Sequence, residues 1–464
     1  MYRSLSVFHA FQIKFCLPMK GFKAYDIRGI YNQDFDRADV YRLGCFLPDL
    51  FNTDRILVGH DHRNTSDEIR ENLVEGLLSR GIDVYDMGLA TTPMVYFTAG
   101  KQGFDASVQI TASHNPAPYN GFKISGKDVM PIGYIDGLNE MEKRVNGADV
   151  PDASRRGQYV PLEPRDDYIG FLKGYYGPSI EKLKLAVDCS DGMAGYVVHD
   201  LLGDRPIYMF DQPDGNFTHH DPNPLKSENQ RYVTRKVLQE GCDAGILYDG
   251  DADRVVFFDE KGRFVSPDLI IALMGHYFMP SVGSRVLQDI RSSRAVKEYL
   301  SRFGAEVHTW KVGRAFACPR LKAIDGLYGG EFAGHYYFKD FYYADSAMMA
   351  TLVVLNVLAD FKEKGVPFSS VIDGISHYSS SGELNYTIEH KRQAIESVVG
   401  YFRDHEQPLE TFDFDGVRMD FADWWFNIRP SNTEPYLRVI VEARTPAMLK
   451  EKVGIIGDVL SNHH

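Results

Sequence analysis

Short apolar runs alternate with longer, helix-like segments over most of the chain. Residues 55–59 form one such run and predict a buried strand. Thr65 and Glu68 have the spacing of a capping box ahead of a helix that Gly81 ends, and another strand follows at residues 84–85. Apolar strands separated by amphipathic helices are typical of βαβ units. We therefore predict a mostly parallel sheet with helices on both faces.

Breaks in this alternation divide the first part of the chain. Residues 143–167 are rich in Arg, Pro, Asp and Gly, and we expect them to form a linker. The strand and helix pattern resumes at residues 183–187. It closes with a hairpin that begins with the strand at residues 255–258 and turns at residues 260–262. This pattern predicts two α/β domains before residue 263.

The pattern of the remaining chain, from residue 263 onward, changes once, near residue 380. A helix is expected at residues 267–279, and residues 347–358 form a long apolar segment. From Gly382 the strands carry more aromatic residues, with helices expected at residues 391–403 and 446–461. The predicted fold class is α/β, with three related mixed-sheet α/β domains plus a C-terminal α+β domain. The expected domain bounds are 19–150, 151–262, 263–375 and 376–464.

Composition and charge exclude several classes of function. Hydrophobic residues make up 44% of the 464 residues and charged residues 25%, both ordinary for a globular protein. No stretch approaches the roughly 18 apolar residues of a membrane span. The formal net charge is -13, so nucleic acid is not an expected partner, and an anionic ligand needs a local cationic site.

The cysteines and the N-terminal segment indicate the compartment. The cysteines are odd in number, lie far apart and show no C-x-x-C spacing, so we expect reduced thiols in the cytoplasm. Polar residues interrupt the apolar run of residues 1–18, which we interpret as an extension ahead of a natural start at Met19 rather than as a signal peptide. The five cysteines are Cys16, Cys45, Cys189, Cys242 and Cys318.

The first candidate catalytic residue is Ser113, which lies in the sequence Thr-Ala-Ser-His-Asn-Pro at residues 111–116. The preceding run, Ala106–Ile110, alternates as a half-buried strand does, and Pro116 prevents its continuation. Ser113 is therefore expected on a strand-end loop. A loop serine more often caps a turn than performs chemistry, so other residues must support a catalytic role.

The second candidate is an acidic loop after another buried strand. Asp249, Asp251 and Asp253 alternate along the chain and can converge on one hard divalent ion, for which we expect Mg²⁺. An EF-hand is excluded, because Arg254 occupies the position that requires glycine. A phosphatase with Asp249 as the nucleophile and Asp251 as the acid and base is chemically sensible, but it leaves Ser113 without a role.

Two further motifs suit phosphate and sugar. Residues 429–435 and Arg438 bring guanidinium, hydroxyl, amide and backbone N–H donors into one turn, which suits a phosphate group. The turn is expected between strands at residues 424–426 and 436–441. In the glycine-rich segment 329–335, backbone can approach a ligand, and Glu331 could accept two sugar hydroxyls.

Together these motifs resemble those of the α-D-phosphohexomutases, and within them the phosphomannomutase/phosphoglucomutase group. The resemblance covers residues 19–464 in the family's order and includes the segments 23–29 and 119–123. It implies four domains around a central cleft and an isomerase that works through a phosphoserine. Its implied ligands are small sugar phosphates, with Mg²⁺ as cofactor and hexose 1,6-bisphosphate as activator and intermediate. We expect a monomer or a weak homo-oligomer.

The resemblance also implies roles for individual residues. Ser113 matches the phosphorylated serine, whose phosphate oxygen would join Asp249, Asp251 and Asp253 as a metal ligand, with Arg254 beside the metal loop. Proton transfer or charge stabilisation is implied for Arg28, Lys123 and His335, and His114 would orient the loop or the phosphate. As a base, Lys123 would need a pKa depressed by nearby cations. The implied substrate-binding residues are Tyr25, Arg291, Gly313, Arg314, Glu331, Arg429, Ser431, Asn432, Thr433 and Arg438.

Departures from the family pattern bear on the choice of sugar. Ala333 stands where relatives usually have Ser, Arg314 where they often have His, and Arg291 where they often have Lys. Asn432 resembles the mannose/glucose group, since phosphoglucosamine mutases typically have Gly there. We expect a mannose phosphate to be preferred and a glucose phosphate to be accepted. A phosphoglucosamine mutase, a sugar phosphatase and a binding protein without catalysis remain alternatives.

Overall fold

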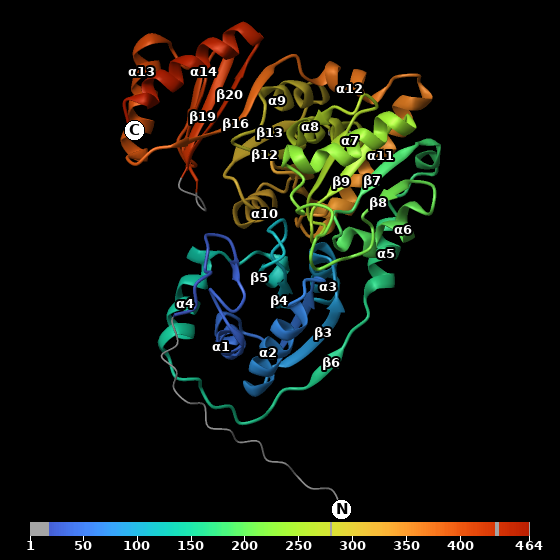
Figure 1. Cartoon of the computed structure of the whole chain (residues 1–464), viewed down its shortest axis with the longest axis vertical. Helices are drawn as coiled ribbons and strands as arrows, with labels where there is room; N and C mark the ends of the chain where they lie inside the picture. Colours follow the sequence, from blue (N-terminus) through green and yellow to red (C-terminus); the bar gives the residue numbers. More distant parts are fainter. Residues whose placement is uncertain (1–17, 279–280, 432–435, 464) are drawn as a thin grey trace, which may run out of the picture.

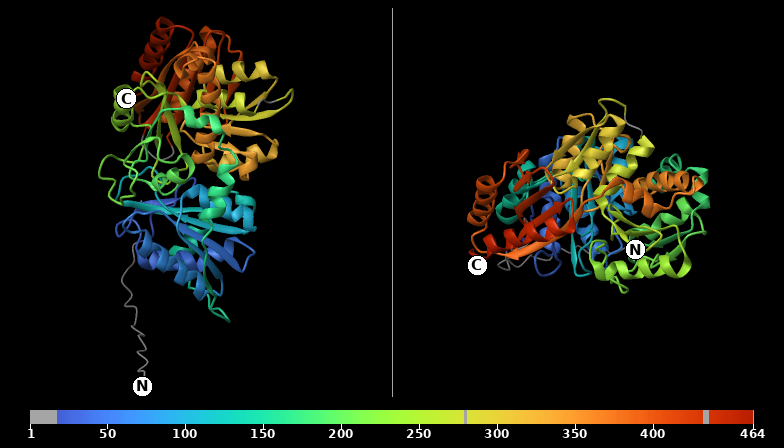
Figure 2. Two further views of the ribbon diagram at one scale, coloured as in Figure 1. Left: turned by 90° about the vertical axis from the view of Figure 1, so that its right-hand side faces the viewer. Right: turned by 90° about the horizontal axis from the view of Figure 1, so that it is seen from above.

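The computed structural model describes residues 18–278, 281–431 and 436–463, which form four sheet-containing units in chain order. In Figure 1 the first unit (blue) lies at the bottom of the view and the other three lie above it, and the left view of Figure 2 shows the same division. The last unit (red) stands at one side of the molecule in Figure 1. This arrangement leaves a region where all four units face one another.

Each unit combines a sheet with helices. The first contains β1 (Ile27–Ile30), α1 (Arg37–Phe46), β2 (Arg55–His60), α2 (Ser66–Ser79), β3 (Asp83–Leu89), α3 (Thr92–Gln102), β4 (Ala106–Ile110), β5 (Tyr119–Gly126), α4 (Leu138–Gly147) and β6 (Tyr159–Pro161). The second contains α5 (Arg165–Lys173), β7 (Leu185–Asp188), α6 (Val198–Leu202), β8 (Ile207–Met209), α7 (Ser227–Glu240), β9 (Ala244–Tyr248), β10 (Val255–Phe258) and β11 (Phe264–Val265).

The third and fourth units follow. The third contains α8 (Pro267–Phe278), β12 (Arg285–Asp289), α9 (Arg294–Leu300), β13 (Glu306–Trp310), α10 (Arg314–Ala323), β14 (Tyr328–Gly330), β15 (Tyr336–Phe338), α11 (Ala347–Glu363) and α12 (Phe368–Ile375). The fourth contains β16 (Ser379–Thr387), α13 (Lys391–His405), β17 (Glu410–Phe412), β18 (Val417–Asp420), β19 (Trp424–Pro430), β20 (Tyr436–Ala443) and α14 (Pro446–Ser461).

The first three sheets mix parallel and antiparallel strands. Their orders are β1-β5-β4-β2-β3-β6, β11-β10-β9-β7-β8 and β13-β12-β14-β15. In the first sheet β4, β2, β3 and β6 run parallel, whereas β5 runs antiparallel to both of its neighbours, β4 and β1. The fourth sheet, β16-β20-β19-β18-β17, is antiparallel throughout. The structure therefore has the predicted fold class of three mixed-sheet α/β units and one α+β unit.

Three local predictions are wrong. Residues 143–167 are not all linker, because α4 runs to Gly147 and β6 pairs with β3, so the first sheet extends past residue 150. The capping box at Thr65 is absent, since Thr65 makes no cap hydrogen bond and its hydroxyl accepts from Asn120 Nδ2 instead. Strand β4 is buried on both faces rather than one, because it lies between β5 and β2 and helices cover the sheet.

The hydrophobic cores show which units are packed against one another. One continuous apolar cluster runs from α3 of the first unit through β7, β9 and β10 of the second to α8 and α11 of the third. The fourth unit has its own cluster around Trp424, between its sheet and α13 and α14. The first three units thus share a core, and the fourth is packed separately.

Two expectations from composition can be compared with this fold. Cys45, Cys189, Cys242 and Cys318 are buried free thiols, and Cys16 lies outside the described residues. Within the described ranges, none of the helices combines the length and apolar character needed to cross a bilayer.

Glycines let α1 and α2 approach closely in the first unit. A Cβ added to Gly76 would lie 2.2 Å from the carbonyl oxygen of Tyr41, and one added to Gly44 would lie 2.4 Å from the carbonyl oxygen of Leu73. Neither backbone oxygen can move without displacing its helix. The helix pair therefore depends on the absence of side chains at this crossing.

We expect Gly76→Ala to lower the thermal midpoint of unfolding by about 2–4 °C, because overpacking costs about 1–3 kcal/mol and outweighs the better helix propensity of Ala. The matched control is Gly170→Ala in α5, where a Cβ would meet nothing within 4 Å. Differential scanning calorimetry of the two variants provides the test. Equal midpoints for both variants and the parent would contradict the packing argument.

Candidate active site

A cavity of about 1030 Å³ lies where the four units meet. The predicted site residues that line it are Tyr25, Arg28, His114, Lys123, Asp253, Arg254, Arg291, Gly313, Arg314, Glu331, His335, Arg429, Ser431 and Arg438. Ser113, Asp249 and Asp251 are fully buried next to lining residues rather than on the wall itself. Asn432 and Thr433 lie outside the described residues. All the other predicted site residues thus gather at one place.

Ser113 lies on the loop that follows β4, as predicted. Its backbone φ of 51° is in the left-handed region, and its N–H donates to Thr111 Oγ1 at 2.9 Å. Its hydroxyl donates to Asp249 Oδ2 at 2.9 Å, across 136 residues of sequence. The strained turn therefore aims the serine hydroxyl directly at the acidic loop of the second unit.

The acidic loop connects β9 to β10, and a glycine allows it to reach Ser113. A Cβ on Gly250 would lie 2.5 Å from the carbonyl oxygen of Ser113. Ala252 turns the loop with a φ of 62°. Any side chain at position 250 would push the acidic loop away from the serine loop, so the contact between the first two units requires this residue.

The carboxylates of the loop converge beside Ser113. Asp249, Asp251 and Asp253 are buried, and each offers an oxygen within 4.8 Å of the others. Burial and the charges of Asp253 and Asp251 raise the pKa of Asp249 well above that of a free aspartate. Asp251 Oδ1 and Asp253 Oδ1 have no hydrogen-bond partner among the described residues. Buried like charges with unsatisfied oxygens fit a hard divalent cation such as Mg²⁺.

Lys123, on β5, partly neutralises this cluster. Its Nζ donates to Asp251 Oδ2 at 2.6 Å and also to Asp253. Burial disfavours the ammonium, but Asp251 and Asp253 outweigh burial and raise the pKa of Lys123. The depressed pKa that Lys123 would need as a base is not found, because the nearest charges are carboxylates rather than cations. In this arrangement Lys123 is a charged donor.

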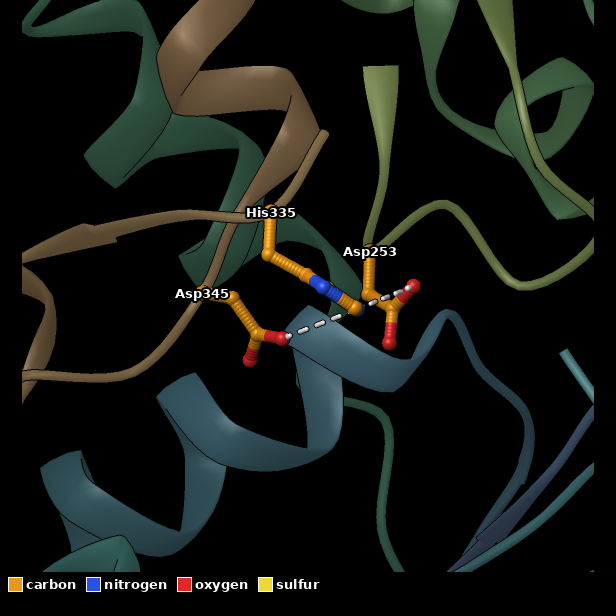
Figure 3. A group of neighbouring side chains, drawn as sticks. All are labelled: Asp253, His335 and Asp345. Carbon is orange, nitrogen blue, oxygen red and sulfur yellow. Dashed lines mark ion pairs between the residues drawn. The ribbon is translucent and has the colours of Figure 1, made fainter. Parts of the chain in front are cut away.

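His335 lies between carboxylates from two units (Figure 3). Its Nδ1 is 3.0 Å from Glu331 Oε2, and its Nε2 accepts a hydrogen bond from Arg254 Nε at 3.1 Å. Asp253 Oδ1 and Asp345 Oδ2 lie 3.6 and 3.8 Å from Nε2. Burial and Arg254 disfavour the imidazolium, but Asp253 and Glu331 raise the pKa of His335 to about 9. The ring can thus accept from Arg254 when neutral or face Asp253 and Asp345 when protonated.

Arg28 and His114 line the cavity close to the serine loop. Arg28, on β1, donates from Nη1 to Asn115 Oδ1 at 2.7 Å and pairs with Asp26. Burial, followed by the positive charges of Arg254 and Arg28, lowers the pKa of His114 well below its ordinary value. His114 is therefore a neutral ring beside the serine, suited to orienting groups rather than to holding charge.

Arg63, which sequence reasoning missed, holds the serine loop in shape. Its guanidinium is buried, pairs with Asp61 at 3.1 Å, and donates to the carbonyl oxygens of Ser113 at 2.9 Å and Asn115 at 2.7 Å. Phe217 of the second unit covers it at 4.8 Å from the ring centroid. A signal was available, because Asp61 and Arg63 directly follow a predicted strand, and ends of adjacent parallel strands share one edge of a sheet.

The predicted sugar loop is the turn between β14 and β15. Glu331 Oε1 accepts the N–H of Gly313 at 2.6 Å, and its other oxygen faces His335. Gly313 has a φ of 112°, and a Cβ there would lie 3.1 Å from the ring of Tyr25. Glu331, Gly313 and Ala333 line the cavity, so the loop lies where a ligand could reach it.

Arg314, predicted to bind substrate, already has protein partners for its guanidinium. Nε donates to Asp345 Oδ1 at 3.1 Å, and Nη2 donates to the carbonyl oxygen of Val129 at 3.1 Å. The group also lies 3.8 Å above the ring of Tyr96 in α3. Arg314 therefore joins the third unit to the first. Although Arg314 lines the cavity, its N–H groups donate mainly to other groups of the protein rather than pointing into the cavity.

The fourth unit contributes arginines at one end of the cavity. Arg429 on β19 and Arg438 on β20 are direct cross-strand partners, and Arg291 after β12 lines the same cavity. Arg429 lies on a strand rather than in the predicted turn, because β19 continues to Pro430. Burial and the charge of Arg291 lower the pKa of Arg429. Such crowding of cations favours an anionic ligand.

Comparison with known proteins gives consistent matches along the chain. Models of the phosphoglucomutase/phosphomannomutase family match four times: alpha/beta/alpha domain I at residues 19–149, domain II at 166–262, domain III at 266–378, and the C-terminal domain at 383–453. No break in the family's domain order occurs.

Individual relatives cover nearly the whole chain. A phosphomannomutase of Escherichia coli (strain K12) is 35% identical over 443 residues, which are 93% of this chain and 96% of the relative. One of Methanocaldococcus jannaschii is 32% identical over 450 residues, covering 95% and 97%. A solved phosphoglucomutase/phosphomannomutase family protein of Burkholderia thailandensis superposes with a TM-score of 0.83 at 26% identity, covering 95% and 97%.

We expect Asp251→Asn to weaken Mn²⁺ binding by about tenfold or more, because the change removes one anionic oxygen from the buried cluster. Electron paramagnetic resonance of free Mn²⁺ measures the affinity. The control is Asp423→Asn, which alters a half-exposed carboxylate paired with Arg444 on the fourth unit. If Asp251→Asn binds Mn²⁺ as tightly as the control does, the acidic loop is not a cation site.

Proposed function

This chain belongs to the phosphoglucomutase/phosphomannomutase family, and from that premise we propose that it interconverts hexose 1-phosphates and hexose 6-phosphates through a phosphorylated Ser113. The observation that carries this proposal is the hydrogen bond from Ser113 Oγ to Asp249 Oδ2 at 2.9 Å. It joins a nucleophilic hydroxyl to a carboxylate cluster suited to Mg²⁺. A serine that only capped a turn would not need three buried carboxylates beside it.

In the proposed cycle, phospho-Ser113 gives its phosphoryl group to a hydroxyl of the bound hexose monophosphate. The Ser113 oxygen is the leaving group and takes up a proton, while the attacking hydroxyl loses one. The hexose 1,6-bisphosphate then turns in the cavity and returns its other phosphate to Ser113. Isomerisation follows without net consumption of phosphate.

Asp249, Asp251 and Asp253 would hold the metal. Mg²⁺ bound there would neutralise charge on the transferring phosphoryl group. Lys123 and Arg28 face the same end of the cavity, and as fixed cations they would stabilise the same negative charge. The raised pKa of Lys123 supports this role over that of a base.

We assign proton transfer to His335. It lines the cavity, lies 3.6 Å from Asp253, and has carboxylates near both ring nitrogens. These neighbours let the ring hold one proton or two, as an acid and base must in a reaction that runs in both directions. His114, a neutral ring beside Ser113, would orient the phosphoryl group.

The phosphate that does not react would be held by the fourth unit. Arg429 and Arg438 lie side by side on neighbouring strands, and Arg291 approaches from the third unit. Ser431 lines the cavity next to them, and Asn432 and Thr433 follow it in the sequence. Guanidinium groups match the geometry of phosphate oxygens, so this end suits a phosphate that stays bound while the other reacts.

We expect Ser113→Ala to lower the conversion of mannose 1-phosphate to mannose 6-phosphate by roughly three orders of magnitude or more, because the phosphate carrier is lost. The assay contains Mg²⁺ and a catalytic amount of hexose 1,6-bisphosphate. Ser370→Ala, an exposed substitution in α12, should retain the parent rate.

Two results would overturn the proposal. Near-normal conversion by Ser113→Ala would show that Ser113 carries no phosphoryl group. Steady release of inorganic phosphate by the parent protein would instead favour a phosphatase with Asp249 as nucleophile, although Asp249 is buried and its Oδ2 accepts the Ser113 hydroxyl.

Among sugars, we expect mannose 1-phosphate to have the highest kcat/KM, with glucose 1-phosphate close behind and glucosamine 1-phosphate about tenfold lower. The relatives of this chain named phosphomannomutases support the first choice. The ammonium of glucosamine would meet a cavity lined by Lys123, Arg254 and Arg291. Measuring all three sugars on one preparation decides the order, and a preference for glucosamine 1-phosphate would contradict it.

A further inference from the structure

A carboxylate of the protein itself lies among the arginines of the fourth unit. Glu383 Oε1 is 3.3 Å from Arg438 Nη1, and Oε2 is 4.0 Å from Arg429 Nη2 and 3.9 Å from Arg291 Nη1. All four residues line the same cavity. One carboxylate thus faces three guanidinium groups that approach from two units, which is the arrangement expected around a bound anion.

Each arginine of this cluster has a carboxylate neighbour among the described residues. Arg291 pairs with Asp289 at 2.6 Å, Arg429 lies 3.7 Å from Asp415, and Arg438 pairs with Glu383. A phosphate dianion that binds these arginines therefore brings two negative charges close to existing carboxylates. Binding of the phosphate is favourable only if one of these carboxylates moves away from the arginines.

Among these carboxylates, Glu383 has the side chain that can most readily move away from the arginines. Asp289 also accepts the N–H of Phe332 at 2.9 Å, and Asp415 accepts the N–H of Val312 at 2.8 Å, so backbone bonds hold both in place. Glu383 follows a register shift in β16 and a Gly382 with φ of 64°. Its side chain is 23% exposed, compared with 5% for Arg429.

From these contacts we infer that Glu383 competes with the phosphate that does not react, here called the distal phosphate. In the free protein Glu383 contacts the arginines that would bind this phosphate, and it moves away from them when the sugar phosphate binds. The inference rests on the proposed function, because it assigns the distal phosphate to Arg291, Arg429 and Arg438. It assigns Glu383 a role that opposes binding, whereas a carboxylate that merely orders the arginines would assist it.

This competition has a use in a reaction whose intermediate must turn round. A phosphate held by three guanidinium groups without a rival leaves slowly, since each contact that breaks loses a charge-assisted hydrogen bond. When Glu383 returns to the arginines, its carboxylate replaces part of the lost interaction, so release costs less. Glu383 therefore weakens ground-state binding and speeds the release that reorientation requires.

The test uses the Mg²⁺-loaded full chain carrying Ser113→Ala, so that binding is measured without turnover, with mannose 1-phosphate as the probe in isothermal titration calorimetry. Adding Glu383→Gln should lower the Kd by about fivefold, because the competing charge is gone while the side chain keeps its size. In the active protein, which retains Ser113, Glu383→Gln should lower KM because the substrate binds more tightly, and should lower kcat because the phosphate is released more slowly.

The control is Glu389→Gln, which makes the same charge change at an exposed position of the fourth unit. It should leave the Kd unchanged. A Kd that is unchanged or higher in Glu383→Gln, with a normal unfolding midpoint, overturns the inference, since the residue would then be neutral or would support the arginines. Absence of sugar phosphate binding in every variant would instead count against the proposed function itself.

Discussion

The site depends on the burial of three carboxylates against a serine hydroxyl from another unit. Asp249, Asp251 and Asp253 repel one another in a place that water does not reach, and only cations can hold them there. The protein supplies part of that charge through Lys123 and leaves oxygens that suit a divalent ion. Gly250 permits the approach, because any side chain would strike the serine loop. This contact joins the first two units at the site, in addition to the apolar core that they share.

Hydrophobic packing divides the molecule into the first three units, which are joined by one apolar cluster, and the fourth unit, which has its own. The first three units share one apolar core, so Ser113, the acidic loop and His335 keep their relative positions. The fourth unit has its own core, and its contacts with the third include polar bonds, such as those from Arg418 to the carbonyl oxygens of Ile290 and Ser292. Polar contacts break at lower cost than a continuous core. In the proposed reaction, the shared core would keep the groups of phosphoryl transfer in position, and the separately packed fourth unit would hold and release the phosphate that does not react.

The sequence predicted the elements well wherever local pattern decides the structure. The structure confirmed the helix predicted from residue 267, as far as Phe278, together with the hairpin around residues 255–262 and both helices of the last unit. Predictions failed where a distant residue decides the outcome. Thr65 makes no capping hydrogen bond and accepts from Asn120 instead, and Lys123 has carboxylate neighbours that raise its pKa. For Arg314, which lines the cavity, the spacing gave no indication of its contacts with Asp345 and Tyr96. The bonds from Arg63 to the backbone carbonyls of the serine loop could not be predicted from residue type, although its position after a predicted strand beside Asp61 was a signal.

By itself, the sequence determined the fold class, the family and many of the charged residues that line the cavity, because residue types with strong chemistry recur at fixed short spacings. Only the tertiary structure decided how those residues act on one another. A pKa depends on charges a few ångströms away, and at this site these come from other units: Asp253 beside His335 and Asp251 beside Lys123. Spacing along the chain specifies the groups present, whereas their protonation and pairing follow from distances that only folding creates.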